Sequence, residues 1–342
     1  MAPIALDALR TDNPNILKAP MPHILAPTTK YDDWRADLQR DGYAVLKNAI
    51  PYEKALEYQQ QAFKWLKSFG NDELDLSNPD TWIAKNIPKQ SKITNTFDSY
   101  AIAHEKFMWD ARMEPNVVGA FAKLWETDEL LVSFDSLNIT LPNRKDVTPI
   151  GSWEHIDQSP FRRGIHCVQG IINLSKAGPE DGGLVVLPGS HNLHDEYIET
   201  QTDHSTWKKD DLIFVNKEQL AWFKSRNIHP HKVCADPGDL ILWDSRVVHY
   251  GAVPSPASNT IRTVIYASYA PAKLASSETL KLKAEVFRRY DGTSHWPYDN
   301  IAVKDATSIE GHGTKDPWAR ERPTEMPELS DKLLKLAGVK PY

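Results

Sequence analysis

Cysteine is scarce in this sequence, and long hydrophobic runs are absent. The 342 residues include two cysteines, Cys167 and Cys234, which are too few for a disulfide framework. No apolar stretch approaches the roughly 18 residues of a membrane-spanning helix, and Asp7 and Arg10 interrupt the N-terminal segment before a secretory signal can develop. These absences predict a cytoplasmic protein with no membrane partner.

A cluster of basic residues is also missing. The chain has 40 Lys and Arg residues against 46 Asp and Glu residues, which gives a formal charge of −6. A nucleic-acid interface normally needs a basic patch, so no nucleic-acid partner is expected. Hydrophobic residues at 41% and charged residues at 25% are ordinary for a globular protein. The expected partner is a small molecule, and both a monomer and a homodimer stay open.

The hydrophobic pattern changes twice along the chain. Prolines interrupt the first thirty residues, which we interpret as an extended N-terminal arm. Ala55, Tyr58 and Trp65 share one stripe of a helix predicted over residues 51–69, and a second helical region is expected at about 103–127. We expect residues 31–342 to form a single domain with a helical buttress at 31–130, a β core at about 131–271 and a helical C-terminal tail at 272–342.

Short apolar segments fill the expected β core. Each is four to eleven residues long and is bounded by Gly, Pro, Asn or Asp. The segments are LVSFDSLNITL, SWEHID, HCVQGIINL, GLVVLPGSH, DLILWD and IRTVIYASY. Regularly spaced short strands with such punctuation are typical of a barrel or a double-sheet jelly roll. The sequence therefore predicts a mainly β fold with a helical buttress.

The pattern His155-Ile156-Asp157, followed by His249, carries the strongest chemical signal. Side chains alternate across a strand, so His155 and Asp157 are expected on one face. A His-x-Asp pair is common by chance, but here it opens the β region and a second histidine follows an apolar strand. Two imidazoles and one carboxylate form the facial triad of non-haem Fe(II) oxygenases, whereas a structural zinc site would use four ligands. We interpret His155, Asp157 and His249 as metal-ligating catalytic residues.

Arg262 is the main candidate for binding a cosubstrate. On its predicted strand it shares a face with Val264 and Tyr266, where a guanidinium is unfavourable unless it meets an anion. An ion pair within the protein is one explanation. Beside an iron site, a cosubstrate carboxylate is the stronger one, because the planar guanidinium binds carboxylates in a bidentate manner. Ser268, two residues beyond Tyr266, would add a hydrogen bond.

Two amides complete the set of candidate cofactor-binding residues. Gln169 and Asn138 lie in predicted strands and would hydrogen-bond the cosubstrate or the substrate if they point inward. Buried structural amides are an equally good explanation. His191, in the turn Pro188-Gly189-Ser190-His191, is not expected to be a ligand.

Together these segments resemble the phytanoyl-CoA dioxygenase-like (PhyH) family of Fe(II)/2-oxoglutarate-dependent oxygenases. The resemblance extends over about residues 31–300. The matching motifs are His155-Ile-Asp157, Gly182–His191, Pro237–Asp244 followed by His249, and Arg262. The resemblance implies a double-stranded β-helix, which is a cupin-like jelly roll, with Fe(II) held by His155, Asp157 and His249. It also implies that Arg262 binds the distal carboxylate of 2-oxoglutarate and that O₂ is a cosubstrate.

The activity that the resemblance implies is a dioxygenase reaction of secondary metabolism. A small organic molecule, such as a carboxylate or a natural-product intermediate, would undergo hydroxylation, desaturation or cyclisation with release of succinate and CO₂. The adjacent Arg162 and Arg163 are candidates for an anionic substrate, although a solvated loop explains them equally well. Two alternatives stay open, a cupin-type metalloenzyme of other chemistry and a catalytically silent binding protein on the same fold.

Overall fold

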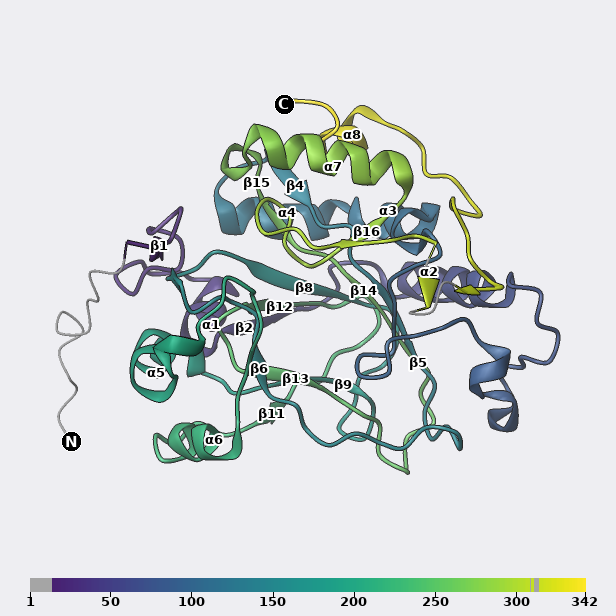
Figure 1. Ribbon diagram of the computed structural model, residues 1–342, viewed down its shortest axis with the longest axis horizontal. Helices are drawn as coiled ribbons and strands as arrows, with labels where there is room; N and C mark the ends of the chain where they lie inside the picture. Colours follow the sequence, from purple (N-terminus) through teal and green to yellow (C-terminus); the bar gives the residue numbers. More distant parts are fainter. Residues whose placement is uncertain (1–13, 308, 311–313) are drawn as a thin grey trace.

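Two antiparallel sheets form the centre of the structure, a computed structural model that describes residues 14–307, 309–310 and 314–342 (Figure 1). The five-stranded sheet has the order β10 (Ile213–Phe214), β6 (His155–Ile156), β13 (His249–Ala252), β9 (Gly183–Val186) and β11 (His231–Lys232). The six-stranded sheet has the order β2 (Tyr43–Leu46), β12 (Leu240–Asp244), β8 (Val168–Asn173), β14 (Arg262–Tyr266), β5 (Leu137–Thr140) and β3 (Thr96–Phe97). The prediction of a mainly β chain with helices is confirmed.

Helices cover the outer faces of both sheets. The described helices are α1 (Arg35–Asp41), α2 (Tyr52–Lys67), α3 (Lys106–Arg112), α4 (Pro115–Trp125), α5 (His194–Gln201), α6 (Lys217–Lys224), α7 (Ser277–Arg289) and α8 (Asp331–Leu336). In Figure 1, α3, α4 and α7 lie above the six-stranded sheet, and α5 and α6 lie beside the five-stranded sheet. The helix predicted over residues 51–69 is confirmed as α2. The predicted region 103–127 divides into α3 and α4 at Pro115, whose ring cannot continue a helix.

Four short pairs of strands complete the described structure. They are β1 (Leu17–Lys18) with β7 (Arg162–Arg163), β4 (Leu130–Val132) with β15 (Tyr269–Pro271), β16 (Gly292–Thr293) with β17 (Val303–Lys304), and β18 (Ile309–Glu310) with β19 (Thr314–Lys315). The first thirteen residues of the predicted arm lie outside the described residues. In the part of the chain that the structure describes, no helix is long and apolar enough to cross a membrane.

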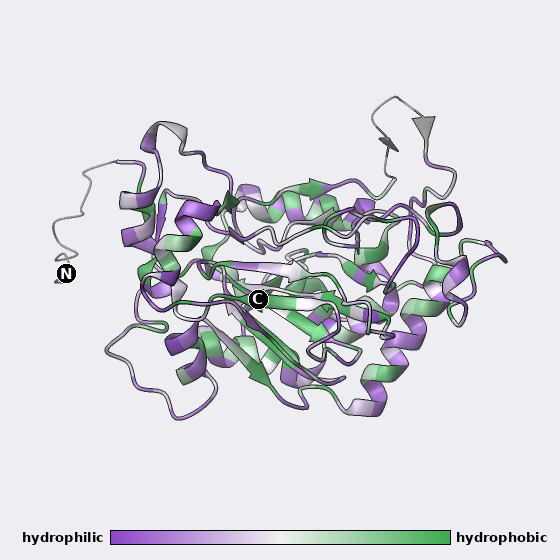
Figure 2. Cartoon of the chain, turned by 90° about the horizontal axis from the view of Figure 1, so that it is seen from below, coloured by the Kyte–Doolittle hydropathy of each residue, from purple (hydrophilic) through white to green (hydrophobic). Residues whose placement is uncertain are grey.

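Alternating side chains divide the core into layers. On β12, Leu242 packs into the cluster beneath the helices, whereas Ile241 and Trp243 pack between the two sheets. On β14, Ile265 faces the helices and Val264 faces the other sheet. The strands are correspondingly hydrophobic in Figure 2, while the helices carry polar residues as well. The predicted alternation along β14 is confirmed for these residues, so the face that contains Arg262 and Val264 points between the sheets.

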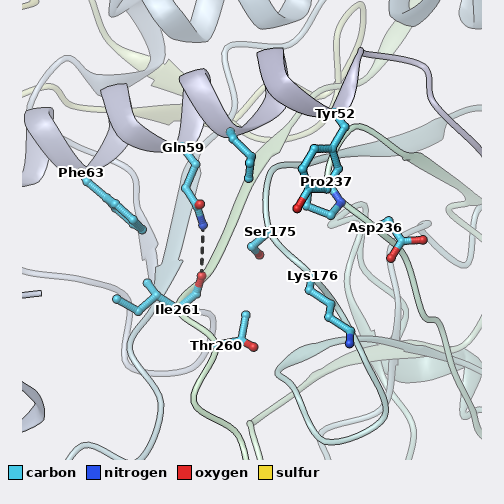
Figure 3. A pocket seen from close by; sticks show the side chains of 10 residues that line it. Tyr52, Gln59, Phe63, Ser175, Lys176, Asp236, Pro237, Thr260 and Ile261 are labelled. Carbon is cyan, nitrogen blue, oxygen red and sulfur yellow. Dashed lines mark hydrogen bonds between the residues drawn. The ribbon is translucent and has the colours of Figure 1, made fainter. Parts of the chain in front are cut away.

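The start of β14 is tied to α2 across a hollow of about 420 Å³ (Figure 3). Gln59 on α2 donates hydrogen bonds to the carbonyl oxygen of Ile261, at 3.4 Å, and to Oγ1 of Thr263, at 3.2 Å. These two residues flank Arg262. The contacts therefore hold in place the part of β14 from which the Arg262 side chain extends between the sheets.

Gly238 lies in the turn before β12, and its backbone hydrogen bonds connect this turn to β8 and to the segment that follows β2. Gly238 donates a backbone hydrogen bond to Asn173 and accepts one from Ile50, at 2.7 and 2.9 Å. Its φ of +93° lies in the left-handed region, and a methyl group there would overlap the carbonyl oxygen of Ile50. Only glycine fits this turn without strain.

We therefore predict that Gly238→Ala lowers the free energy of unfolding by about 2 kcal/mol or more. The measurement is urea-induced unfolding followed by tryptophan fluorescence. Gly119→Ala on α4 is the matched control, because no described atom lies within 4 Å of its added methyl group. That change should raise the free energy of unfolding by about 0.5–1 kcal/mol, since alanine is favoured in a helix interior. Equal stability of Gly238→Ala and the wild type would show that this turn is not strained.

Candidate metal centre

Two neighbouring strands bring the predicted ligands together. His155 on β6 lies directly opposite His249 on β13 in the antiparallel register, and the centroids of the two rings are 4.2 Å apart. Asp157 follows β6 in a bend, with Oδ1 3.6 Å from Nε2 of His155 and Oδ2 3.3 Å from Nε2 of His249. One ligand atom from each residue lies within 4.8 Å of the other two. The structure therefore places all three predicted ligands around one point.

Backbone carbonyl groups set the tautomer of both histidines. Nδ1 of His155 lies 3.1 Å from the carbonyl oxygen of Trp153, and Nδ1 of His249 lies 3.0 Å from that of Val247. A carbonyl oxygen only accepts hydrogen bonds, so each Nδ1 carries the proton. Each Nε2 then directs its lone pair at Asp157, which is the arrangement that a metal ligand needs.

The charge state of the three residues also suits a metal ion. Burial lowers the pKa of His155 to about 4, and the nearby His249 lowers it further, so the imidazole is neutral at pH 7. Burial alone would raise the pKa of Asp157, but His155 and His249 hold this pKa well below its ordinary value. His155 thus offers a neutral imidazole and Asp157 a carboxylate, which are the deprotonated forms that bind metals.

These donors fit an iron ion of the facial-triad type. Two nitrogen atoms and one carboxylate oxygen are the protein ligands of such sites, and the remaining positions are left for small molecules. Among the described residues, no other histidine, cysteine, aspartate or glutamate joins this group. A four-ligand structural zinc site is therefore not formed here.

Gln169 positions the carboxylate of the triad. Its Nε2 donates a hydrogen bond to Oδ2 of Asp157 at 2.9 Å, and it lies 3.3 Å from Oγ of Ser245. The backbone N–H of Asp157 donates to the carbonyl oxygen of Ser245 at 3.0 Å. Gln169 therefore orients the Asp157 carboxylate, while Ser245 fixes the backbone of the same residue.

The three ligands open into a cavity of about 430 Å³ between the sheets. Arg262 lines the same cavity and is 6% exposed, with Nε buried and without a hydrogen-bond partner among the described residues. The strands beneath the cavity contribute Ile171 and Trp243. The predicted ligands and the predicted carboxylate-binding arginine therefore line one cavity.

The two amides and Ser268 differ in their positions. Gln169 lines the cavity but is engaged by Asp157. Asn138 also lines it, although its amide donates to the carbonyl oxygen of Thr94 at 2.5 Å and accepts from Oγ1 of Thr140 at 3.0 Å. Both side chains thus already form hydrogen bonds with protein groups.

Ser268 does not line the cavity. β14 ends at Tyr266, and the Ser268 backbone instead pairs with Ser133, whose N–H donates to the Ser268 carbonyl oxygen at 2.9 Å. The alternation that links Arg262 to Tyr266 stops before Ser268. Its position therefore does not support the expected hydrogen bond to a cosubstrate.

Arg162 and Arg163 also face away from the cavity. Arg162 pairs with Asp211 at 3.0 Å and Asp299 at 2.9 Å, and Arg163 forms an ion pair with Glu199. Neither arginine lines the cavity. Their role as a contact for an anionic substrate is therefore not supported, and these charges stabilise the surrounding segments.

Sequence reasoning missed a polar group on the cavity wall. Lys304 on β17 extends into the cavity lining, where its Nζ lies 3.4 Å from Oδ2 of Asp98 and 3.9 Å from Oδ1 of Asp135. Ser136 donates a hydrogen bond to Asp98 at 2.7 Å. Except for Lys304, whose strand has two residues, these residues lie outside regular strands, so no periodic signal marks them.

Apolar side chains surround the triad on another side. The ring of Trp153 stacks on that of His155 with centroids 4.4 Å apart and an angle of 7° between the planes. Ile93, Leu212 and Val253 also line the cavity, and Ile93 and Leu212 are about half exposed. The cavity thus combines an apolar wall beside the triad with the polar group around Lys304.

Comparison with known proteins identifies related sequences and folds. A sequence model of the phytanoyl-CoA dioxygenase (PhyH) family matches residues 38–255. Ava biosynthesis cluster protein O of Aspergillus versicolor is 38% identical over 281 residues, which cover 80% of this chain and 88% of that protein. Ectoine dioxygenase of Sphingopyxis alaskensis is 26% identical over 227 residues, or 63% of this chain and 68% of that protein.

A solved structure extends the likeness in fold. The GlcNAc Inducible Gene 2 protein of Candida albicans matches with a TM-score of 0.62 at 14% identity, and the match covers 96% of this chain and 80% of that protein. At this identity the likeness concerns the arrangement of the chain alone.

We predict that Gln169→Leu weakens metal binding about 10-fold or more, because Asp157 loses the donor that orients it. The measurement is competition for the metal with a chromogenic chelator. Gln61→Leu is the matched control, since Gln61 is an exposed residue of α2 and does not line the cavity. Equal affinity of Gln169→Leu and the control would contradict the positioning role.

Proposed function

Because the chain belongs to the phytanoyl-CoA dioxygenase family of Fe(II)/2-oxoglutarate-dependent oxygenases, we propose that it oxidises a small organic molecule and releases succinate and CO₂. Hydroxylation, desaturation and cyclisation are the reactions that we propose for it. The observation that carries the proposal is the convergence of His155, Asp157 and His249 in the cavity that Arg262 also lines.

The two sheets support a finer description of the fold. We propose that they form a double-stranded β-helix, a cupin-like jelly roll, within a single domain over residues 31–342. Two antiparallel sheets of four or more strands pack face to face around Ile171, Leu184 and Trp243, as such a fold requires. The helices of the N-terminal and C-terminal segments cover the outer face of the six-stranded sheet (Figure 1).

Each residue of the site has a defined role in the proposal. His155, Asp157 and His249 would hold Fe(II), and Gln169 keeps the Asp157 carboxylate turned toward it. When bound, iron together with 2-oxoglutarate and O₂ supplies the oxidation of a substrate C–H bond coupled to decarboxylation of the cosubstrate. Arg262 offers its guanidinium to the distal carboxylate of 2-oxoglutarate. The buried side chains of Ile171 and Trp243 shield the reacting groups from water on the side of the six-stranded sheet.

The cavity supports a substrate with an apolar body and a polar group. Trp153 and Leu212 present apolar surface beside the triad, whereas Asp98, Asp135 and Lys304 present hydrogen-bonding groups. Likeness to a biosynthesis cluster protein of Aspergillus versicolor supports a natural-product intermediate of secondary metabolism as the substrate. Arg162, Arg163 and Lys304 are each paired with carboxylates of the protein, so none of the three supports a carboxylate group on the substrate.

We also propose that the enzyme works in the cytoplasm. Both cysteines are free, and Cys234 is exposed. A free exposed thiol is compatible with a reducing compartment.

Arg262→Ala tests the cosubstrate site. We predict that it raises the KM for 2-oxoglutarate about 10-fold to 100-fold, because the distal carboxylate loses a charge-assisted hydrogen bond. The measurement is succinate formation and O₂ consumption with Fe(II), over a range of 2-oxoglutarate concentrations and a panel of candidate substrates.

His155→Ala provides the second arm of this experiment. It should abolish both iron binding and succinate formation, because the two remaining ligands, Asp157 and His249, do not hold the metal on their own. The proposal would be wrong if the wild type formed no succinate from 2-oxoglutarate, with or without a substrate, while retaining zinc tightly.

A further inference from the structure

A second cavity lies beside the one that contains the triad. Its volume is about 760 Å³, compared with about 430 Å³ for the cavity of the triad, and we refer to the two as the side cavity and the metal cavity. Residues from three segments, 84–95, 144–150 and 316–318, line the side cavity. Ser91 and Asn95 line both cavities. The segment 91–95 is therefore a wall that the two cavities share.

Hydrogen bonds hold the shared wall in one conformation. The N–H of Ser91 donates to the carbonyl oxygen of Thr96, and the N–H of Asn95 donates to that of Ser91, both at 2.9 Å. Nε2 of Gln90 donates to the carbonyl oxygens of Asn95, at 3.1 Å, and of Ile139 on β5, at 2.7 Å. The wall is thus tied to the six-stranded sheet, and both cavities are preformed on either side of it.

The tip of the shared wall is exposed. Lys92 lines the side cavity and the adjacent Ile93 lines the metal cavity, and both side chains are exposed. Neighbouring residues of one loop tip therefore form the edges of the two cavities. A molecule bound in one cavity can extend across this tip into the other without displacing a buried side chain.

Charged groups in the side cavity are matched within the protein. Arg144 donates from Nε and Nη2 to the two carboxylate oxygens of Asp146, at 3.0 and 2.7 Å. Asp316 is 8% exposed, and it accepts hydrogen bonds from the Tyr100 hydroxyl and from the N–H of Trp318. These groups connect the three lining segments to the rest of the protein and do not require a charged ligand.

The other lining residues give the side cavity an apolar surface. Trp318 packs partly against the main core, and Val147 is 41% exposed at the cavity. Exposed apolar side chains that gather at a cavity are typical of a binding site, and an indole ring presents a flat surface to a ligand ring. The apolar residues of the lining are Ala84, Ile87, Pro88, Val147, Ile150, Pro317 and Trp318. The surface therefore fits an uncharged group that contains rings.

The volume of the metal cavity favours a substrate that extends beyond it. Iron and 2-oxoglutarate would occupy part of the 430 Å³, whereas sites for drug-sized ligands measure about 300–1,000 Å³. A compact substrate would fit the remaining space. A larger natural-product intermediate needs additional room, and the side cavity supplies it next to the shared wall.

We propose that the two cavities form one substrate site and that the substrate is an elongated molecule. Its uncharged, ring-bearing part occupies the side cavity, crosses the tip formed by Lys92 and Ile93, and leaves the carbon to be oxidised beside the triad. The inference rests on the proposed function and narrows its substrate class. It excludes a compact molecule that is held in the metal cavity alone.

Binding of diphenylhexatriene tests the shape of the site. This neutral probe has two phenyl rings joined by a six-carbon chain, and it fluoresces in apolar surroundings. Its Kd is measured by fluorescence titration of the Fe(II)-loaded protein with 2-oxoglutarate and without O₂. Val147→Asp places a charge in the side cavity, and Leu212→Asp places one in the metal cavity. Each should raise the Kd about 10-fold or more, because the probe would have to desolvate the new carboxylate.

Val339→Asp is the matched control. Val339 lines neither cavity, and its exposed fraction of 37% is close to those of Val147 and Leu212, 41% and 47%. The control should leave the Kd unchanged. All three variants should keep the Tm of the wild type, since exposed positions contribute little to stability.

Thr148→Trp extends the test to turnover. Thr148 is exposed and lines the side cavity, so a tryptophan there would fill the space that we assign to the remote part of the substrate. For a compound that the wild type oxidises, the variant should raise the KM about 10-fold. Succinate formed from 2-oxoglutarate without a substrate should not change. An unaltered KM would contradict the inference.

The outcomes separate the inference from the proposed function. A Kd that is insensitive to Val147→Asp would place the probe in the metal cavity alone, and insensitivity to Leu212→Asp would place it in the side cavity alone. Either result, or no binding to the wild type, overturns the inference, as would equal weakening by Val339→Asp. If the wild type forms no succinate from 2-oxoglutarate, the proposed function itself is wrong, whatever the probe does.

Discussion

The site depends on the register that places His249 directly opposite His155. β13 pairs with β6 on one side and with β9 on the other, so the register is specified twice. The neighbouring Val248 and Ile156 pack into the cluster that α5 and α6 cover, on the outer face of this sheet. A slip of one residue would expose those apolar groups and turn the histidine away. The same hydrophobic burial that stabilises the sheet therefore aims both imidazoles into the cavity.

Two kinds of structure line the cavity, and they carry different chemistry. His155, His249, Gln169 and Arg262 belong to regular strands, whose hydrogen-bonded ladders fix the direction of each side chain. Several residues around the rest of the cavity, among them Ile93, Asp98, Asp135 and Leu212, lie in irregular segments. Strands hold geometry more rigidly than loops, and loops change sequence more freely. Such a division lets the substrate change while the groups around the metal stay in place.

Residues of the site that belong to a local strand pattern could be predicted from the sequence, whereas residues placed by contacts between distant segments could not. The pattern of His155 and Asp157, and the alternation of Arg262 with Val264, are local properties of a strand and could be read directly. Ser268 illustrates the limit of this reasoning, because alternation holds only while the strand continues and β14 ends two residues earlier. Lys304 could not be identified, since its approach to Asp98 depends on how distant segments pack.

The position of Lys304 has a consequence for the order in which the enzyme becomes complete. All three metal ligands and Arg262 precede residue 263, so the strands that bear them are synthesised before the segment that contains β17. That later segment contributes the lysine that contacts Asp98 and Asp135 on the cavity wall. During synthesis, a chain can therefore hold its metal-binding residues, Arg262 and most of the cavity wall before the lysine that pairs with Asp98 and Asp135 exists.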